Sequence, residues 1–284
     1  MKFSRSSTNI FIPDGTALDD ACARTTHLGV GAHQDDLEFM ALQGIAECFH
    51  SEAKWFTGVV CTDGSGSARG KAYAGLTGNE MRKLRRDEQN RAAQLGRFGL
   101  MLQLDFPSSA VIGSANDDLK NDLRQILVKT RPRHIYTHNP ADKHDTHIAV
   151  VMALLLALRE LPADWRPETV HGCEVWRDLD WLPDDEKVIY DLSDYEELGN
   201  TLNGVFVSQI AAGKRYDLAV AGRRRSNATF ANSHATDQCK LAAVAMDLTP
   251  LIIKPELDIV SYVTVAIDRF KQDVVSKLNR QLER

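Results

Sequence analysis

The sequence predicts an α/β fold, a Rossmann-like three-layer sandwich with a mostly parallel sheet and a decorated C-terminal part. Over the first 160 residues, short apolar runs alternate with amphipathic segments of helical length. Such alternation is typical of βαβ units in a parallel sheet that is covered on both faces. Polar clusters directly follow three of the four apolar runs, at the sheet edge where α/β proteins bind ligands. Both observations place a ligand site in this first part of the chain.

The alternation begins with the apolar run 27–32, a strand that breaks into a polar cluster. Residues 37–49 then carry apolar side chains at helical spacing, and residues 55–61 form a second strand that ends at a turn-rich segment. The charged segment 77–95 predicts an amphipathic helix, because a Thr-x-x-Glu capping box opens it. The remaining units are strands at 100–106 and 134–137 and helices at 116–129, which Pro132 stops, and at 145–161.

The pattern is looser after residue 162. Strand candidates occur at 170–176, 188–190 and 242–248, and helices are predicted at 195–209 and 261–282. No Pro-, Gly- or Ser-rich linker separates this part from the first, and the sequence contains no internal repeat. We therefore expect one domain over residues 1–284, with its chemistry in a core of about residues 27–160.

The composition is that of an ordinary globular protein of 284 residues, with 43% hydrophobic and 26% charged residues. The formal net charge of −5 argues against a nucleic-acid-binding protein, because such proteins present a basic face. The longest apolar run, 148–158, is too short to insert into a membrane. The five cysteines form no Cys-x-x-Cys pair and the N-terminus has no apolar signal segment, so we expect reduced thiols and a cytoplasmic location. The sequence leaves a homo-oligomer open.

Two clusters of histidine and carboxylate follow strands that share the ligand-binding edge. The first is His33-Gln34-Asp35-Asp36, and the second runs from His138 to His147 and includes His144. Histidine and aspartate are zinc ligands, and a catalytic zinc takes three protein ligands. In His144-x-x-His147 both imidazoles face the same side of a helix start. Taken alone, the Asp-Asp pair suits a turn or helix cap and the His-x-x-His pair suits a surface, but together at one edge they favour a metal site.

The same residues resemble a known family. His33-Gln34-Asp35-Asp36-Leu37-Glu38 and the segment from Asn139 to Val150 are similar to the two signature segments of the PIG-L (LmbE-like) deacetylases. The segment from Thr62 to Gly70 and the helix around Arg85-Arg86-Asp87-Glu88-Gln89 also look like that family. The resemblance covers roughly residues 27–160. It implies zinc-dependent hydrolysis of an N-acetyl group, usually on an amino sugar such as N-acetylglucosamine in a glycoconjugate.

The resemblance also implies a role for the residues of both clusters. His33, Asp36 and His147 would hold the zinc, and Fe²⁺ would suit the same ligands. Asp35 would be the general base that takes a proton from the attacking water and later passes it to the leaving amine. His144 would stabilise the oxyanion. These roles are physically consistent, since zinc brings the pKa of water to about 7 and a positioned base adds roughly 10²–10⁴-fold to the rate.

The chain departs from the family pattern at two positions. Gln34 stands where the family usually has proline, and we expect only a modest consequence for the backbone. Thr146 stands where the family usually has an aspartate, which would be a natural partner for an active-site imidazole. Asp142 or Asp145 could supply that carboxylate instead, and we still expect an active enzyme.

Substrate contacts are predicted at two arginines. Arg69 lies in the Gly-rich loop after the second strand and could hold a sugar hydroxyl or phosphate, although a solvated loop arginine is the plainer interpretation. Arg223 lies in the basic run 223–225, which is either a solvated face or a site for an acidic or phosphorylated substrate. Trp176, in a part of the chain that also holds Trp165 and Trp181, is either a core residue or a platform for sugar stacking.

The leading hypothesis is a zinc-dependent N-deacetylase whose partner is a small-molecule or glycoconjugate substrate, with no nucleic acid and no membrane insertion. Two alternatives stay open. His33-Gln34-Asp35 with a distant histidine resembles the two-His-one-carboxylate set of non-haem iron oxygenases, which usually have all-β scaffolds. A catalytically lapsed carbohydrate-binding or regulatory protein with the same fold would explain Thr146.

Overall fold

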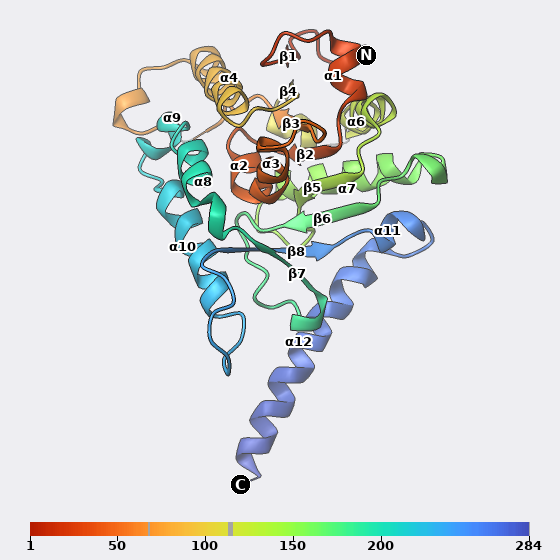
Figure 1. The fold of residues 1–284 in the computed structure, drawn as a ribbon, viewed down its shortest axis with the longest axis vertical. Helices are drawn as coiled ribbons and strands as arrows, with labels where there is room; N and C mark the ends of the chain where they lie inside the picture. The colour runs from red at the N-terminus through yellow and green to blue at the C-terminus, as the bar shows by residue number, and fades with distance from the viewer. Residues whose placement is uncertain (68, 113–115, 284) are drawn as a thin grey trace.

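The computed structural model describes residues 1–67, 69–112 and 116–283, and within them an eight-stranded sheet runs through both parts of the chain (Figure 1). The strands are β1 (Asn9–Phe11), β2 (His27–Gly31), β3 (Phe56–Thr62), β4 (Leu100–Phe106), β5 (His134–His138), β6 (Thr169–Cys173), β7 (Lys187–Asp191) and β8 (Ala242–Asp247). Their order in the sheet is β1-β4-β3-β2-β5-β6-β8-β7. Strands β2 to β6 pair in parallel, whereas β1 and β8 pair antiparallel with their neighbours. The predicted mostly parallel sheet is therefore confirmed.

The helices of the described residues alternate with these strands. They are α1 (Leu18–Ala23), α2 (Asp36–Met40), α3 (Leu42–Phe49), α4 (Gly78–Leu95), α5 (Ser108–Ile112), α6 (Asn116–Thr130), α7 (Asp145–Arg159), α8 (Glu196–Asn203), α9 (Val207–Ile210), α10 (Tyr216–Thr229), α11 (Pro250–Ile253) and α12 (Ile259–Leu282). Short 3₁₀ turns occur at Lys71–Tyr73, Ala163–Trp165, Asp184–Glu186 and Ser193–Tyr195. The predicted capping box of α4 is present, with Thr77 and Glu80 bonded in both directions.

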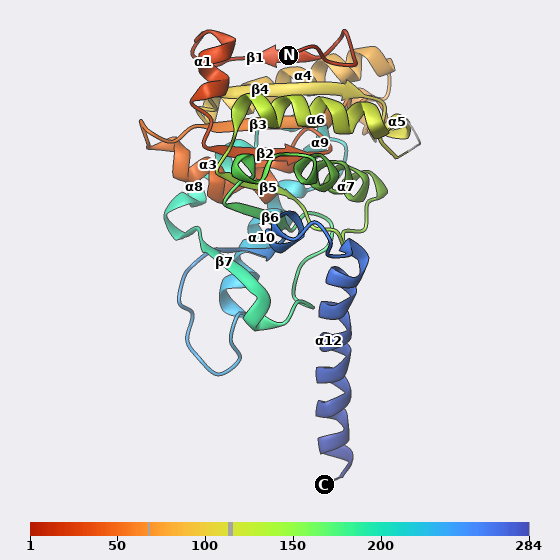
Figure 2. The same cartoon turned by 90° about the vertical axis from the view of Figure 1, so that its right-hand side faces the viewer.

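Helices cover both faces of the sheet and form two separate apolar cores (Figure 2). Helices α1, α6, α7 and α11 bury their apolar residues on one face, and α2, α3, α4 and α8 do so on the other. Successive residues of a strand point to opposite faces, so Val59 and Cys61 of β3 lie in the first core and Val60 lies in the second. The predicted three-layer sandwich follows from this arrangement.

Two predicted helices are interrupted in the structure. The helix expected at 37–49 breaks at Ala41 into α2 and α3. Near this break the side chain of Arg224 donates hydrogen bonds to the backbone carbonyls of Glu38 and Phe39, which satisfies polar groups that lie inside the protein. The helix expected at 195–209 divides into α8 and α9 around Gly204. The prediction also omitted β1, α1, α5, α10 and α11.

Helix α12 leaves the body of the protein and extends away from it (Figures 1 and 2). Its first turns pack through Ile259, Val263 and Ala266, whereas every residue from 267 to 283 is exposed. None of the helices in the described ranges, α12 included, combines the length and apolar character needed to cross a membrane.

Candidate metal centre and active site

The two predicted clusters meet at the point where the strand order reverses. Strands β2 and β5 are neighbours, but the chain visits β3 and β4 on one side of β2 before it returns to β5 on the other side. Such a switch point leaves a crevice at the carboxyl ends of the two strands, where α/β proteins bind ligands. His33 follows β2, and His144 and His147 lie at the start of α7 after β5. The topology thus brings together residues more than 100 positions apart in the sequence.

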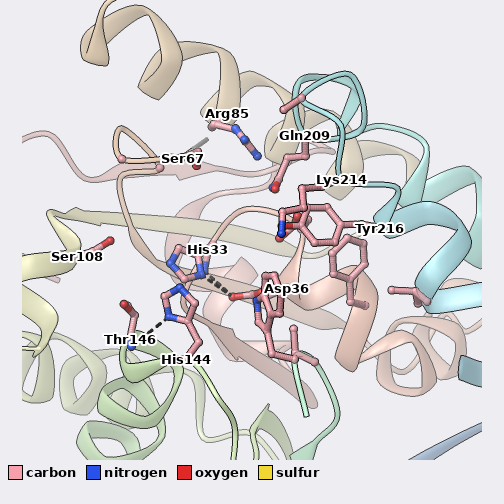
Figure 3. Close-up of a pocket in the computed structure, with 18 of the residues that line it drawn as sticks. His33, Asp36, Ser67, Arg85, Ser108, His144, Thr146, Gln209, Lys214 and Tyr216 are labelled. Carbon is pink, nitrogen blue, oxygen red and sulfur yellow. Dashed lines mark hydrogen bonds and ion pairs between the residues drawn. The ribbon is translucent and has the colours of Figure 1, made fainter. Parts of the chain in front are cut away.

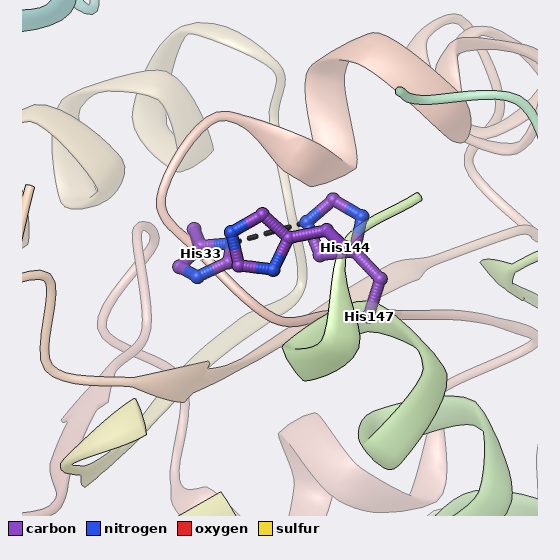
Figure 4. Close-up of side chains that lie close together, drawn as sticks. All are labelled: His33, His144 and His147. Carbon is purple, nitrogen blue, oxygen red and sulfur yellow. Dashed lines mark hydrogen bonds between the residues drawn. The ribbon is translucent and has the colours of Figure 1, made fainter. Parts of the chain in front are cut away.

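Three of these side chains, His33 and His147 (Figure 4) and Asp36 (Figure 3), place donor atoms at metal-site spacing. His33 Nδ1 lies 3.2 Å from His147 Nε2, and Asp36 Oδ2 lies 3.4 Å from the first nitrogen and 3.6 Å from the second. Ligand atoms about 2.0–2.1 Å from a tetrahedral zinc are about 3.3–3.4 Å apart. The predicted set His33, Asp36 and His147 therefore fits a tetrahedral metal ion with one position left for another ligand.

His138 and His144 lie next to this donor set, and each forms a second possible metal-binding group with two of its members. Two overlapping groups could hold a metal, His33 with His144 and His147, and Asp36 with His138 and His147. The His138 ring stacks on His147 with centroids 3.8 Å apart, and its Nε2 accepts a hydrogen bond of 2.9 Å from the backbone N–H of Ala32. This bond occupies the lone pair of His138 Nε2, so that nitrogen is not available to a metal ion. His138 instead contributes by packing its ring against that of His147. Sequence reasoning gave His138 no role, since a histidine that ends a buried strand looks like a core residue.

Asp142 is the one of the two expected carboxylate partners that contacts an imidazole of the cluster. Asp142 Oδ2 lies 3.3 Å from His147 Nδ1 and accepts a hydrogen bond from the backbone N–H of Trp176. Asp145, the other candidate, is exposed. A carboxylate bonded to the second nitrogen of a metal-ligating imidazole fixes the orientation and tautomer of the ring. Asp142 is therefore in the position that such a partner requires.

Burial controls the charges of this cluster. It lowers the pKa of His147 to about 4, with a further contribution from His138, so the His147 ring is neutral at neutral pH, as a ligand must be. Burial also acts to raise the pKa of Asp36, but the neighbouring His147 and His138 hold it well below its usual range. Asp142 likewise has a lowered pKa, because the hydrogen bond from His147 opposes the effect of burial.

Asp35 precedes α2 and has a left-handed backbone, with φ of 101°. Two buried glutamines hold the peptide that joins it to Gln34. Gln209 Nε2 donates to the Gln34 carbonyl at 2.7 Å, and the Asp35 N–H donates to Gln89 Oε1 at 3.2 Å. Gln89 in turn donates to Glu38 at 2.8 Å. A non-glycine residue in this conformation costs about 1–3 kcal/mol and persists only where its surroundings enforce it, and the two glutamines supply that enforcement.

The side chain of Gln34 anchors the loop that follows β2. It is buried, and its Nε2 donates to the Thr62 carbonyl at 3.1 Å and to Gln103 Oε1 at 3.2 Å. These bonds tie the loop after β2 to the end of β3 and to β4.

The carboxyl group of Asp35 lies beside a buried arginine. Burial raises the pKa of Asp35 well above its usual range, and the charge of Asp36 raises it further. Arg85 is only 2% exposed and reaches the same pocket (Figure 3). Within the described ranges its guanidinium has neither a hydrogen-bond nor an ion-pair partner, and its Nε is fully buried. A buried cation without a partner indicates a position for a polar ligand group. The sequence does not predict Arg85 as a site residue, because it is one of many charged residues in an amphipathic helix.

His144 caps α7 and presents its other nitrogen to the pocket. Its Nδ1 accepts a hydrogen bond of 3.3 Å from the Thr146 N–H, so the proton of the neutral ring is on Nε2. Burial, with the neighbouring His33, lowers the pKa of His144 and favours that neutral form. The ring lies against His147, with centroids 4.7 Å apart. His144 can therefore act as an N–H donor beside the metal set.

The pocket around these residues has a volume of about 680 Å³. Figure 3 shows His33 and His144 at one end and Lys214 and Tyr216 across from them. Arg223 lines the pocket, as does Trp176. Arg69 is exposed, donates to the Ser65 carbonyl at 3.3 Å and is not among the residues that line the pocket. The C-terminal part therefore contributes one whole side of the site.

Comparison with known proteins identifies the first part of the chain. Residues 28–158 match the model of the PIG-L family, GlcNAc-PI de-N-acetylase. This signature-bearing part is therefore similar to the PIG-L family. The deacetylase YaiS of Escherichia coli strain K12, itself described as uncharacterised, is 26% identical over 156 residues, which are 52% of this chain and 76% of that protein.

Solved structures share the fold at low sequence identity. The N,N'-diacetylchitobiose deacetylase of Pyrococcus horikoshii superposes with a TM-score of 0.61 at 17% identity, over 84% of this chain and 89% of its own. The 4-carboxy-2-hydroxymuconate hydratase GalB of Pseudomonas putida KT2440 superposes with a TM-score of 0.60 at 18% identity, over 80% of this chain and 96% of its own. One fold thus carries both a deacetylase and a hydratase, and the chemistry must be argued from the site.

Proposed function

We propose that this protein is a zinc-dependent N-deacetylase, a hydrolase that removes an N-acetyl group from an amino sugar or a related glycoconjugate. The observation that carries the proposal is the triangle of donor atoms from His33, Asp36 and His147 next to the buried carboxylate of Asp35. The match of residues 28–158 to a deacetylase family supports the same reaction.

In this proposal His33, Asp36 and His147 hold the metal, which is zinc or, with the same ligands, Fe²⁺. When bound, the ion supplies Lewis-acid chemistry, since it acidifies water and polarises an amide carbonyl. Zinc retains one open position beside three protein ligands in catalytic sites, and two of the proposed ligands, His33 and Asp36, line the pocket.

Asp35 is the general base. Its carboxylate takes a proton from the water that attacks the amide carbon, and it returns this proton to the sugar nitrogen as the C–N bond breaks, which yields acetate and a free amine. The raised pKa of Asp35 makes it a stronger base than an exposed aspartate. The two glutamines keep the strained backbone fixed while the carboxylate changes charge.

His144 is the oxyanion donor. Its Nε2–H points to the amide oxygen, where negative charge develops as water attacks, and a donor of this kind is worth about 10²–10³-fold in rate. Arg85, which has no hydrogen-bond or ion-pair partner among the described residues, donates to a substrate hydroxyl beside Asp35. Arg223 is a further substrate contact in this proposal, whereas Arg69 lies outside the pocket lining.

The test is acetate release from a panel of N-acetylated sugars and glycosides, with and without a metal chelator. We expect release from at least one glycoside, its loss on chelation and its return on addition of Zn²⁺. Binding of a sugar by calorimetry with no acetate after long incubation would instead support the catalytically lapsed alternative. Turnover that survives complete metal removal would overturn the metal assignment.

A further inference from the structure

One side of the pocket is built by residues outside the family-matched segment 28–158. We call Trp176, Lys214, Tyr216 and Arg223 the outer wall; all four line the pocket. Trp176 follows β6, whereas the other three lie in or just before α10. None of the proposed metal ligands, the base or the oxyanion donor comes from these elements. The outer wall is therefore free to determine which substrate the site accepts.

The aromatic members of the wall begin immediately beside the catalytic histidines. The Trp176 ring centroid is 6.5 Å from that of His144. Tyr216 meets Trp176 edge to face, with centroids 6.0 Å apart and an angle of 85° between the rings. Phe39 extends the surface, 5.7 Å from Tyr216. Together these rings form an apolar surface on which a sugar ring, or a group attached to it, can pack.

The basic residues near the wall differ according to whether they line the pocket. Arg215 and Arg225, which do not line it, form ion pairs with Asp217 and Glu196. Lys214 and Arg223, which do line it, have no ion-pair partner in the part of the chain that the structure describes. Lys214 Nζ instead lies 5.1 Å from the Trp176 ring centroid. Two cations that form no ion pair among the described residues therefore stand at the pocket, although the charge of Arg223 acts to lower the pKa of the buried Glu174 nearby. Their sequence neighbours Arg215 and Arg225 are paired.

The arrangement of the wall favours an anion over a neutral ligand. Arg223 also donates to the Val175 carbonyl, which holds the guanidinium in place at the pocket. A fixed guanidinium and a mobile ammonium on the same side bind a carboxylate or phosphate with charge-assisted hydrogen bonds. The acidic side chains that line the pocket, Asp35 and Asp36, are at its metal end.

We propose that the outer wall binds an anionic group of the substrate, so that the substrate is an acidic N-acetylated glycoconjugate. The acetamide lies at the metal end, the sugar packs against Trp176 and Tyr216, and a carboxylate or phosphate on the group attached to the sugar meets Lys214 and Arg223. This inference rests on the proposed deacetylase function.

The test compares matched aryl N-acetylglucosaminides that differ in one substituent: unsubstituted phenyl, 4-carboxyphenyl and 4-phosphophenyl. We expect kcat/KM for acetate release to be about tenfold higher for an acidic glycoside than for the phenyl glycoside at low salt. This preference should fall as ionic strength rises. The two acidic arms distinguish carboxylate from phosphate recognition. Equal kcat/KM values for all three glycosides would overturn the inference while leaving the deacetylase function intact.

Substitutions of single basic residues test whether the preference for acidic glycosides comes from the outer wall. Lys214→Gln should lower the acidic-to-neutral ratio of kcat/KM about fivefold, and Arg223→Gln about tenfold, because Lys214 is exposed and Arg223 is half-buried. Arg225→Gln, on the same helix but away from the pocket, is the matched control and should keep the ratio of the parent protein. A ratio that falls equally in all three variants would overturn the assignment.

If no glycoside releases acetate, the proposed function fails, and calorimetry with the same three glycosides then tests the wall alone. Tighter binding of an acidic glycoside that Lys214→Gln weakens would support the inference. Equal binding of the three would overturn it.

Discussion

The signature-bearing part of the chain and its C-terminal part form the same pocket in different ways. In the first part, the residues of the metal end follow parallel strands, so the sheet itself determines where they lie. In the second part, the pocket residues come from the segment after β6 and from short helices that pack around that edge. The sheet therefore places the residues of the metal end, whereas the outer side of the pocket depends on segments that follow the parallel strands in the sequence.

The two parts are nevertheless coupled at one place. Gln209 of α9 bonds the carbonyl of Gln34, 175 residues away in the sequence. The preceding residue, Ser208, donates from both its N–H and its hydroxyl to Glu88 of α4. A side chain of the C-terminal part is therefore hydrogen-bonded to the peptide that precedes Asp35. A substitution in the C-terminal part can consequently change the position of Asp35.

The largest effect is expected from Asp35→Asn, which removes the base but keeps the shape of the side chain. Acetate release should fall by roughly 10²–10⁴-fold, the contribution of a positioned base. The metal content, measured by atomic emission, should stay stoichiometric because Asp35 is not in the donor triangle. Asp145→Asn, an exposed carboxylate in the second cluster, is the control. Turnover within twofold of the parent protein would contradict the role of Asp35.

Asp142→Asn tests whether the metal end depends on a carboxylate behind His147. The amide oxygen of asparagine can accept a hydrogen bond from the His147 N–H, but it lacks the negative charge by which a carboxylate makes the imidazole a stronger ligand. We therefore expect the affinity for zinc to fall about 10–100-fold. A competitive titration with a chromophoric chelator measures this affinity, and the thermal unfolding of the metal-free variant separates metal binding from folding. Unchanged affinity would mean that Thr146 needs no compensation at Asp142.

Gln209→Leu breaks the coupling between the two parts. The Gln34 carbonyl then loses its donor and the strained backbone of Asp35 loses one of its two restraints, so we expect kcat to fall about tenfold with little change in KM. Val207→Ala, an exposed residue of α9, controls for disturbance of that helix. If kcat is unchanged while α9 stays folded, the two parts act independently.

The sequence predicts the first part far better than the second for physical reasons. Strands β2 to β5 have short, mostly buried runs with several apolar residues each, and His33 and His147 occur in motifs whose spacing reflects local geometry. The two glutamines that hold Asp35 carry no periodic signal, because a buried amide has the same sequence appearance as an exposed one. Their contacts depend on how distant segments pack, which no local pattern contains.

The run 223–225 shows the same limit within three adjacent residues. Arg223 lines the pocket, Arg224 is buried against backbone carbonyls and Arg225 forms an exposed ion pair with Glu196. Successive residues of a helix point about 100° apart, so a basic run has no single environment. The prediction that Arg223 faces a ligand stays open to the kinetic test above, whereas the interpretation of the whole run as a solvated face is wrong for Arg224.

The smallest effect is expected from deleting residues 270–284, most of the projecting length of α12. All residues of α12 from 267 onward within the described range are exposed, and none lines the pocket. Cutting after Arg269 also keeps its ion pairs with Asp185 and Glu186. We expect kcat/KM to stay within twofold and the midpoint of thermal unfolding to change little, whereas a deletion from residue 259 removes the buried Ile259 and Val263 and should destabilise the protein. A large loss of activity in the shorter deletion would show that α12, and with it the C-terminal part as a whole, does more than shape the outer side of the pocket.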